Sequence, residues 1–508
     1  MPCTTLLVGK QASYDGSTII ARNEDSANGQ FRPKKLIVVQ PQEQPRHYKS
    51  VLSHVQIELP DNPMRYTAVP NAVDDEGIWG QNGVNAANVA MSATETITTN
   101  ERVLGADPLV EFIPAQGQPG SADYVAEIPG GIGEEDIVTI VLPYIHSARE
   151  GVQRLGSLLE QYGTYEMNGI AFSDVNEIWW LETIGGHHWI ARRVPDDCYV
   201  TMPNQLGIDE FDLDDAFGEQ ENYMCSADLR EFIEDNHFDL SVEPSSLFNP
   251  RYAFGSHSDS DHVYNTPRAW YMQRFLNPYD ETWDGPDADH NPMSDDIPWC
   301  RQPERKVTIE DVKYILSSHY QGTVYDPYSV IGNEHTRGIY RPIGINRNDQ
   351  LAVIQLRPYR SEGCRAIQWM AFGSNPFNAL TPFYANVDTT PEYVSCANNH
   401  VTTDSIYWAD RIIGALSDSA FADTANANAR YQEKVGGLGH RMIAATDEQV
   451  ARLEGEDQGT DNVQIRKVLE AANESMAQQL RRETDDLLAD VIYAVSLKMR
   501  NGYHMSDN

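Results

Sequence analysis

The N-terminal part of the chain alternates short apolar runs with a polar turn. The run CTTLLVG, starting at Cys3, is rich in β-branched and apolar residues, and TIIARNED, starting at Thr18, repeats that pattern. Between them, QASYDGS contains Asp15 and Gly16, a pair typical of a tight turn. The pattern therefore predicts a β-hairpin. Because the turn lies about midway, strands of similar length bring residues 22–25 back beside Cys3.

The next part of the chain changes from a strand-like to a helical pattern and back. Residues 83–94 (GVNAANVAMSAT) are strand-like, and a helical pattern covers residues 134–160. Pro143 should kink or split that helix, because proline removes a backbone donor and clashes with the preceding turn. Four runs separated by turn residues then predict an antiparallel meander over residues 169–204.

Two acidic stretches follow the predicted meander. Residues 209–239 and 280–296 are strongly acidic and poor in apolar residues, so we expect surface excursions there, with a short helix at 226–234. Thr308, followed three residues later by Asp311, resembles a capping box and predicts the start of a helix that ends near residue 319.

The remainder of the chain predicts three strands and then helices. The strands end by residue 386, and the pattern is helical beyond about residue 402, with a last helix at 462–499. No repeat or low-complexity linker divides the sequence. We therefore expect one large core, residues 3–400, and a helical C-terminal extension, residues 401–508.

Composition and charge narrow the classes of function. The chain has 508 residues, 41% of them hydrophobic and 22% charged, which is enough to bury a large core. Its formal net charge of −37 repels phosphate backbones and anionic lipids, so nucleic-acid and membrane partners are not expected. No apolar run approaches the roughly 18 residues of a spanning helix, and the N-terminus lacks a signal-peptide pattern, which indicates a cytoplasmic protein.

Of the six cysteines, Cys3 stands out by its position. None belongs to a Cys-x-x-Cys pair, which argues against a disulfide scaffold and a zinc ribbon, and we expect neither a metal nor another cofactor. A cysteine that begins a chain can pass its thiol proton to its own α-amine, since their pKa values are about 8.5 and 8. Arg22 would lower the thiol pKa, and Asp25 could orient the amine. The alternative is a chance cysteine beside a solvated turn.

Longer sequence blocks resemble one enzyme family. CTTLLVGKQASYDGSTIIARNED resembles the opening of the bacterial dipeptidases that use an N-terminal cysteine, relatives of the secernins and, more remotely, of penicillin V acylase and bile-salt hydrolase. EGIWGQNGVNAANVAMSATET, ETIGGHHWIARRVPDDCYVTMPNQ, YNTPRAW and RPIGI are also similar to that family, so the resemblance runs to about residue 390. It implies the N-terminal nucleophile hydrolase fold, an α+β, four-layer αββα sandwich of two antiparallel sheets.

Position by position, the resemblance implies a catalytic set. Cys3 would be the nucleophile and its α-amine the base, Arg22 would polarise the thiol, and Asp25 would hold the amine. Asn204, in MPNQ, fits an oxyanion-hole donor, and Arg268, in NTPRAW, fits a second active-site guanidinium. Two structural alternatives stay open. Asn204 follows a proline and could fix a turn, and Arg268 could be a surface charge at the start of a helix.

The resemblance also indicates residues that contact substrate. Ala93 and Thr94 fall where relatives supply another oxyanion contact, here through backbone because no asparagine stands there. Glu182, in WWLET, is a candidate for binding the substrate's amine. His187 and His188 are predicted to pack or line the pocket rather than hold a metal, because adjacent side chains in a strand point to opposite faces.

The leading interpretation is a cysteine dipeptidase that cleaves dipeptides with a free amino terminus through an acyl-enzyme on Cys3. Small peptides would be its substrates, and we expect a homo-oligomer. Met1 and Pro2 would be a propeptide, because the mechanism needs a free amine on Cys3. One alternative is a linear amide acylase of the penicillin V or bile-salt type, which would lack a carboxylate for the substrate's amine. The other is a secernin-like interaction protein with little peptidase activity.

Overall fold

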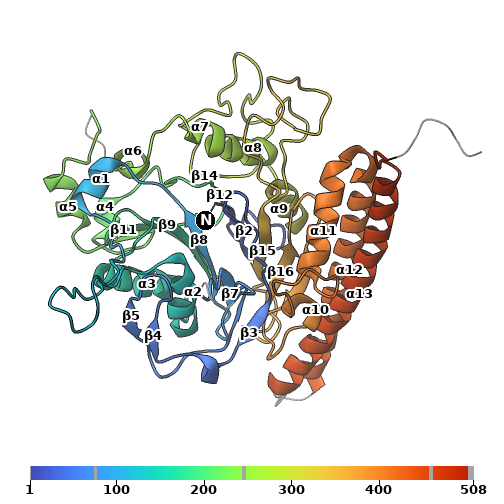
Figure 1. The fold of residues 1–508 in the computed structure, drawn as a ribbon, viewed down its shortest axis with the longest axis horizontal. Helices are drawn as coiled ribbons and strands as arrows, with labels where there is room; N and C mark the ends of the chain where they lie inside the picture. Colours follow the sequence, from blue (N-terminus) through green and yellow to red (C-terminus); the bar gives the residue numbers. More distant parts are fainter. Residues whose placement is uncertain (1, 74–76, 243–246, 457–461, 502–508) are drawn as a thin grey trace, which may run out of the picture.

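The computed structural model describes residues 2–73, 77–242, 247–456 and 462–501. Met1, one of the two expected propeptide residues, lies outside these ranges, as do residues 457–461 and 502–508 of the expected extension. The chain combines antiparallel sheets with helices, and its last long helices stack along one side of the sheets (Figure 1). The expected α+β class and the helical C-terminal region are thereby confirmed.

The predicted N-terminal hairpin forms the centre of a seven-stranded sheet. Cys3 lies opposite Glu24 and Val8 opposite Ile19, and the turn residue Gly16 has a φ of 84°, in the left-handed region that glycine adopts without strain. The three strands predicted late in the chain extend this sheet. In spatial order the strands are β14 (Cys300–Arg301), β12 (Tyr199–Met202), β1 (Cys3–Val8), β2 (Thr18–Asp25), β15 (Asn348–Leu356), β16 (Ala366–Phe372) and β17 (Thr381–Tyr384).

The second large sheet has six strands and corrects part of the predicted meander. Its order is β13 (Tyr223–Cys225), β11 (Trp189–Arg193), β10 (Ile178–Thr183), β9 (Asn168–Ser173), β8 (Ala90–Thr96) and β7 (Asn82–Val84). The meander prediction is correct for β9 to β11 and wrong for β12, which pairs with β1 in the other sheet. Backbone bonds from Gly9 to Cys198 (2.9 Å) and from Gln11 to Asp196 (2.7 Å) tie the β11–β12 loop to the hairpin. Turn residues signal a chain reversal but not the sheet that receives the next strand.

Apolar side chains join the two sheets and cover their other faces. Leu7 and Ile20 of the seven-stranded sheet belong to one core cluster with Trp180 and Ile190 of the six-stranded sheet. Two helices, α2 (Glu134–Val141) and α3 (Ala148–Tyr162), pack on the other face of the six-stranded sheet. The short turn η3 (Leu142–Tyr144), which contains Pro143, separates them, as the sequence predicted. On the other face of the seven-stranded sheet lie α8 (Thr266–Leu276) and α9 (Ile309–Leu316).

Three helices pack against the β15–β17 end of the seven-stranded sheet. They are α11 (Ile406–Ser419), α12 (Phe421–Glu456) and α13 (Asn462–Ser496), and they share a core cluster with Phe372 and Phe383. The capping box at Thr308 and Asp311 is also confirmed, because Thr308 Oγ1 accepts a bond from Asp311 N at 3.1 Å. Predicted and observed helix ends differ by a few residues, which is usual for such boundaries.

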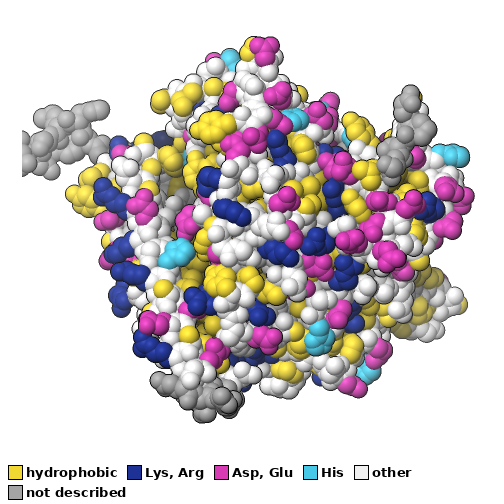
Figure 2. Space-filling model, turned by 180° about the vertical axis from the view of Figure 1, so that it is seen from behind, with side chains coloured by type: hydrophobic (Ala, Val, Ile, Leu, Met, Phe, Trp, Pro, Cys, Tyr) yellow, Lys and Arg dark blue, Asp and Glu magenta, His cyan; other side chains and the backbone are white. Residues whose placement is uncertain are grey.

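The acidic stretches are only partly surface excursions. The segment 209–239 supplies β13 to the six-stranded sheet and includes the predicted short helix as α5 (Leu229–Asp235). Residues 280–296 are all described and contain no helix or strand. On the face in Figure 2 acidic and basic side chains are interspersed. Within the described residues, no helix combines the length and apolar character needed to cross a bilayer.

The remaining elements are short. They are β3 (Ile37–Val39) paired with β6 (Tyr66–Ala68), β4 (His47–Lys49) paired with β5 (Gln56–Glu58), η1 (Pro41–Glu43), α1 (Glu101–Ala106), α4 (Leu213–Ala216), α6 (Pro250–Phe254), α7 (Asp261–Tyr264) and α10 (Glu392–Ser395).

Candidate active site

The Cys3 thiol faces the space between the two large sheets. Successive strand residues point to opposite faces, so Cys3 and Thr5 share the face of Leu7, which belongs to the core between the sheets. On β2, Glu24 lies opposite Cys3 and Arg22 opposite Thr5. The thiol, the guanidinium and the Glu24 carboxylate therefore face the same enclosed region, and Cys3 is 0% exposed.

Arg22 binds the thiol and is itself held by strand β8. Its Nη1 donates to Cys3 Sγ at 3.0 Å, and its Nε donates to Ser92 Oγ at 3.0 Å. The carbonyl oxygens of Ala93 and Thr94 accept further bonds from the guanidinium, at 2.9 and 2.8 Å. These contacts fix the guanidinium plane beside the sulfur.

The backbone of Ala93 and Thr94, expected to contact substrate, takes part in the clamp around Arg22. Both carbonyl oxygens point to Arg22, and the Ala93 N–H donates to Gln81 O at 2.8 Å. Gln81 O also accepts from Arg22 Nη2 at 3.0 Å, so Gln81 belongs to the same clamp and was missed in the sequence. A backbone contact depends on strand register, which the residue types alone do not reveal.

The net pKa of the Cys3 thiol differs from the sequence-based expectation. Burial raises it well above its usual range, and this effect exceeds the lowering by Arg22. The carboxylates of Glu95 and Glu134 raise it further. With Pro2 still attached, the thiol is therefore protonated at neutral pH. Formation of a thiolate requires a base that takes the proton as the sulfur reacts.

Replacement of Arg22 by lysine is expected to slow alkylation of Cys3 in a chain that begins at Cys3. Lysine keeps the positive charge but loses the planar donor fork, and alanine also loses the charge. Because a nearby cation lowers the thiol pKa, both variants should shift the alkylation profile to higher pH. Arg22→Ala should also lower the rate of the expected dipeptide hydrolysis by about 100-fold or more. Iodoacetamide labelling at several pH values, followed by peptide mass analysis, measures the first effect.

Arg357→Lys is a matched control for the loss of a buried guanidinium. Arg357 is buried, donates to Asp447 at 2.6 and 3.0 Å, and follows the end of β15 that pairs with Thr18, away from Cys3. The control should lose stability but keep wild-type thiol reactivity. Wild-type alkylation profiles in both Arg22 variants would show that Arg22 has a structural role only.

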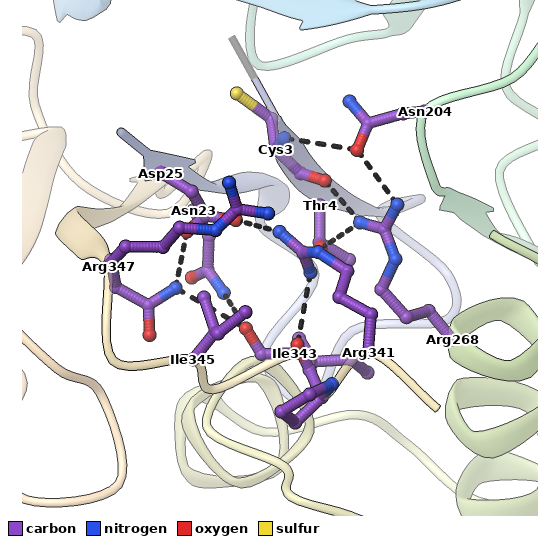
Figure 3. A network of polar contacts seen from close by, with 12 residues as sticks. Cys3, Thr4, Asn23, Asp25, Asn204, Arg268, Arg341, Ile343, Ile345 and Arg347 are labelled. Atoms are coloured by element: carbon purple, nitrogen blue, oxygen red, sulfur yellow. Dashed lines mark hydrogen bonds and ion pairs between the residues drawn. The ribbon is translucent and has the colours of Figure 1, made fainter. Parts of the chain in front are cut away.

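Asn204 and Arg268 bind the backbone of Cys3. Asn204 Oδ1 accepts from Cys3 N at 3.3 Å, and Arg268 Nη1 donates to the Cys3 carbonyl oxygen (Figure 3). Arg268 Nη2 also donates to Asn204 Oδ1 at 2.8 Å. Arg268 is 0% exposed, which rules out a surface charge, and burial lowers its pKa to about 10. Asn204 Nδ2 donates to Thr96 O at 2.8 Å, so the group expected in an oxyanion hole is engaged elsewhere.

Asp25 does not bind the Cys3 nitrogen in this structure. Its carboxylate accepts a hydrogen bond from Arg341, which lies on the side of the hairpin away from the thiol (Figure 3). It also accepts one from Asn348. Its backbone N–H donates to Pro2 O at 3.0 Å. Strand alternation explains the difference, because Asp25 is one residue past Glu24, the partner of Cys3. Arg341 was missed as a candidate, although it begins the RPIGI block.

The carboxylate of Glu182, the candidate for binding the substrate's amine, accepts hydrogen bonds from this chain. It is 0% exposed, and Oε1 accepts from Trp180 Nε1 at 2.9 Å and from Gly207 N at 2.7 Å. Burial raises its pKa to about 7, although these hydrogen bonds oppose the shift. Glu182 thus fastens the loop after β12 to β10. The sequence showed a carboxylate at a strand end but not the donors around it.

The two adjacent histidines share one carboxylate partner. The Nδ1 atoms of His187 and His188 lie 3.1 and 2.7 Å from the carboxylate of Asp107, and both residues precede β11 instead of lying within it. The expectation that their side chains point to opposite faces of a strand was therefore wrong. The ring of His188 stacks on Phe232, and a place of either histidine in the substrate pocket stays a prediction. In the described part of the chain, no group of three or more His, Cys, Asp or Glu side chains is placed to hold a metal ion.

The protein thus combines antiparallel sheets with a buried thiol–guanidinium pair between them. The model of Peptidase family C69 matches residues 2–434. The chain belongs to that peptidase family. It is 66% identical to a dipeptidase of Bifidobacterium longum and 52% identical to a probable dipeptidase A of Streptococcus pyogenes serotype M3, each over 100% of both chains. It is also 42% identical to dipeptidase A of Lactobacillus helveticus, over 96% of both.

Proposed function

We propose that the protein is a cysteine-type dipeptidase in which Cys3, freed of the residues before it, is the nucleophile. The observation that carries this proposal is the contact of 3.0 Å between Arg22 Nη1 and Cys3 Sγ in an enclosed region. The Cys3 nitrogen lies at the same site, held by Asn204. The printed names of the relatives, dipeptidase and probable dipeptidase A, support the substrate class.

In the proposed reaction the α-amine of Cys3 takes the Sγ proton while sulfur attacks the scissile carbonyl carbon. The carbonyl electron pair moves to oxygen and returns as the carbon–nitrogen bond breaks, and the Cys3 ammonium gives its proton to the leaving amine. Water then attacks the thioester, with the amine as base, and the thiol is restored as the acid is released. Arg22 stabilises charge that develops on sulfur throughout.

The remaining polar residues are proposed to position Cys3. Asn204 and Arg268 hold its nitrogen and carbonyl oxygen, and Asp25 anchors Arg341 beneath the hairpin. An oxyanion role for Asn204 would require its Nδ2 to leave Thr96 O. In this proposal Asp25 supports the site indirectly, by holding Arg341. Its carboxylate reaches the freed amine of Cys3 only if the end of the hairpin shifts when Pro2 is removed.

The proposed fold is the four-layer αββα arrangement of N-terminal nucleophile hydrolases. Support comes from the shared core between the two sheets and from the helices on their other faces. We divide the chain into a catalytic core, residues 3–400, and an extension, residues 401–508, packed on it. A cytoplasmic location and a homo-oligomeric state remain predictions of this proposal.

A substrate panel tests the proposal against its two alternatives. A chain beginning at Cys3 is expected to hydrolyse alanyl-leucine and related free dipeptides, and to act poorly on N-acetylated dipeptides, penicillin V and bile-salt conjugates. Release of amino acids, measured by mass spectrometry, gives the rates. Preference for an acylated compound would favour the amidase alternative. A folded, correctly processed chain without turnover on any of them would favour the interaction protein.

A further inference from the structure

Glu95 lies beside the thiol on the opposite sheet. The pairing of β8 with β9 shifts between Ala93 and Glu95, which places Glu95 opposite Gly169. Gly169 lies opposite Glu182 on the face that contributes Trp180 to the core between the sheets, so Glu95 faces the same region as Cys3.

One oxygen of the Glu95 carboxylate has a partner and the other has none. Oε2 accepts from Thr5 Oγ1 at 2.8 Å, and Thr5 is the next residue after Cys3 on the inner face of β1. Oε1 is buried without a hydrogen-bond partner, and Glu95 is 0% exposed. A buried acceptor left unpaired is costly, so this atom requires an explanation.

The cations around Glu95 donate to other groups. The hydrogen bonds of Arg22 go to Cys3 and to acceptors on β8 and Gln81. Those of Arg268 go to backbone and side-chain oxygens around Cys3. Burial accordingly raises the pKa of Glu95 to about 8, although Arg268, Thr5 and Arg22 oppose the shift. Such a carboxyl group favours an added cation.

Other buried carboxylates in this part of the protein already have partners. Glu24 pairs with the buried ammonium of Lys34 at 2.5 Å. Glu182 accepts bonds from Trp180 and Gly207, and Glu134 is approached by Gln81 Nε2 at 3.4 Å. Glu24 Oε2 is also buried without a hydrogen-bond partner, but the charge of that carboxylate is paired with Lys34. Glu95 differs because the donor to its bonded oxygen is the neutral hydroxyl of Thr5, which leaves its charge without a hydrogen-bonded cation.

The strand spacing between Cys3 and the partner of Glu95 is of the size that the amine of a dipeptide requires. Its ammonium nitrogen lies about 2.5 Å from the scissile carbonyl carbon, which sulfur must approach within about 3.5 Å. With a hydrogen bond of about 2.8 Å, the accepting oxygen should lie roughly 5 to 8 Å from Sγ. Thr5, which binds Glu95, is two residues along β1 from Cys3, a separation of about 7 Å.

We propose that Glu95 Oε1 binds the free α-ammonium group of the substrate and is the residue that selects an unblocked amino terminus. This inference rests on the proposed dipeptidase function and assigns to Glu95 the role that the sequence placed on Glu182. A primary ammonium supplies a positive charge and a donor to the unpaired oxygen. An N-acylated peptide supplies neither and adds bulk where the carboxylate is enclosed.

The test compares alanyl-leucine with propionyl-leucine, which differs by replacement of the ammonium group with hydrogen. Wild type, Glu95→Gln, Glu134→Gln and Glu182→Gln are each prepared as chains beginning at Cys3. Glu95→Gln should lower kcat/KM for alanyl-leucine by about 30-fold or more, mainly through KM, because a buried charge pair loses one partner. Its kcat/KM for propionyl-leucine should change little. Alkylation of Cys3 should be as fast as in wild type or faster, because a negative charge near the thiol is gone.

Glu182→Gln is the matched control, since it removes an equally buried carboxylate whose oxygen is already bonded. It should lower thermal stability and leave the ratio between the two substrates unchanged. If Glu95→Gln lowers kcat/KM equally for both substrates, the proposal is overturned. Glu95 would then act on the Cys3 nucleophile rather than on the substrate's amine. Loss of selectivity in Glu134→Gln alone would also overturn it. If the wild-type enzyme fails to cleave alanyl-leucine, the proposed function is refuted. If an active Glu95→Gln enzyme keeps the wild-type ratio of kcat/KM for the two substrates, only the role of Glu95 is refuted.

Discussion

Replacement of Cys3 by alanine is expected to abolish dipeptide hydrolysis, with kcat lowered by about ten-thousand-fold or more. The side chain that forms the acyl bond is then absent, and the groups that position it, Arg22 and Asn204, have nothing to activate. Hydrolysis of alanyl-leucine by the processed variant measures the loss. Iodoacetamide should inactivate the wild-type enzyme to a similar extent.

Cys225→Ala is the control for removal of a buried thiol. Cys225 lies on β13, is 9% exposed, and has a pKa raised by burial to about 12. Its replacement should leave kcat near the wild-type value, because three strands of the six-stranded sheet separate β13 from β8, the strand that holds Arg22. EDTA should also leave activity intact. Strong inhibition by chelator that zinc or manganese reverses would contradict the cysteine mechanism, as would an active Cys3→Ala variant.

Local patterns predicted those parts of the fold that depend on neighbouring residues. The hairpin from Cys3 to Asp25, the break at Pro143 and the cap at Thr308 each follow from residues close together in sequence. The position of β12 did not, because it depends on a pairing with β1 nearly 200 residues away. Turn chemistry reverses the chain but leaves the receiving sheet to tertiary packing.

The candidate site likewise has features that the sequence predicted and features that it did not. Residue types and the resemblance brought Cys3, Arg22, Asn204 and Arg268 to one place, and the structure brings them into contact. The thiol pKa was misjudged because its net direction depends on burial, which composition does not reveal.

The sequence also could not show which buried glutamate is free to bind the amine of a substrate. Glu182 and Glu95 both stand at strand ends in the sequence, yet one is surrounded by donors and the other leaves an oxygen unpaired. Only the sheet register and the loop after β12 separate these two environments.

A chain that retains Pro2 is expected to hydrolyse dipeptides at least about 1,000-fold more slowly than one that begins at Cys3. In the retained form the Cys3 nitrogen is an amide, whose lone pair is delocalised into the carbonyl and accepts no proton. Burial raises the thiol pKa, and the contact of Sγ with Arg22 offers a donor but no base. The fold itself should be unaffected, because the β1–β2 pairing begins at Cys3 and Pro2 adds only its bond to Asp25 N.

Two forms of the protein test this prediction, the full chain and a chain from which a specific protease releases Cys3 as the first residue. Mass analysis of the N-terminus establishes which residues each form carries before activity is measured on alanyl-leucine. Circular dichroism and thermal unfolding should agree closely between the two forms, so that a difference in rate reports the chemistry of the amine. The thiol of the retained form should also alkylate more slowly at pH 7, a readout that needs no substrate. Full activity in a chain shown by mass to keep Pro2 would refute the amine as general base.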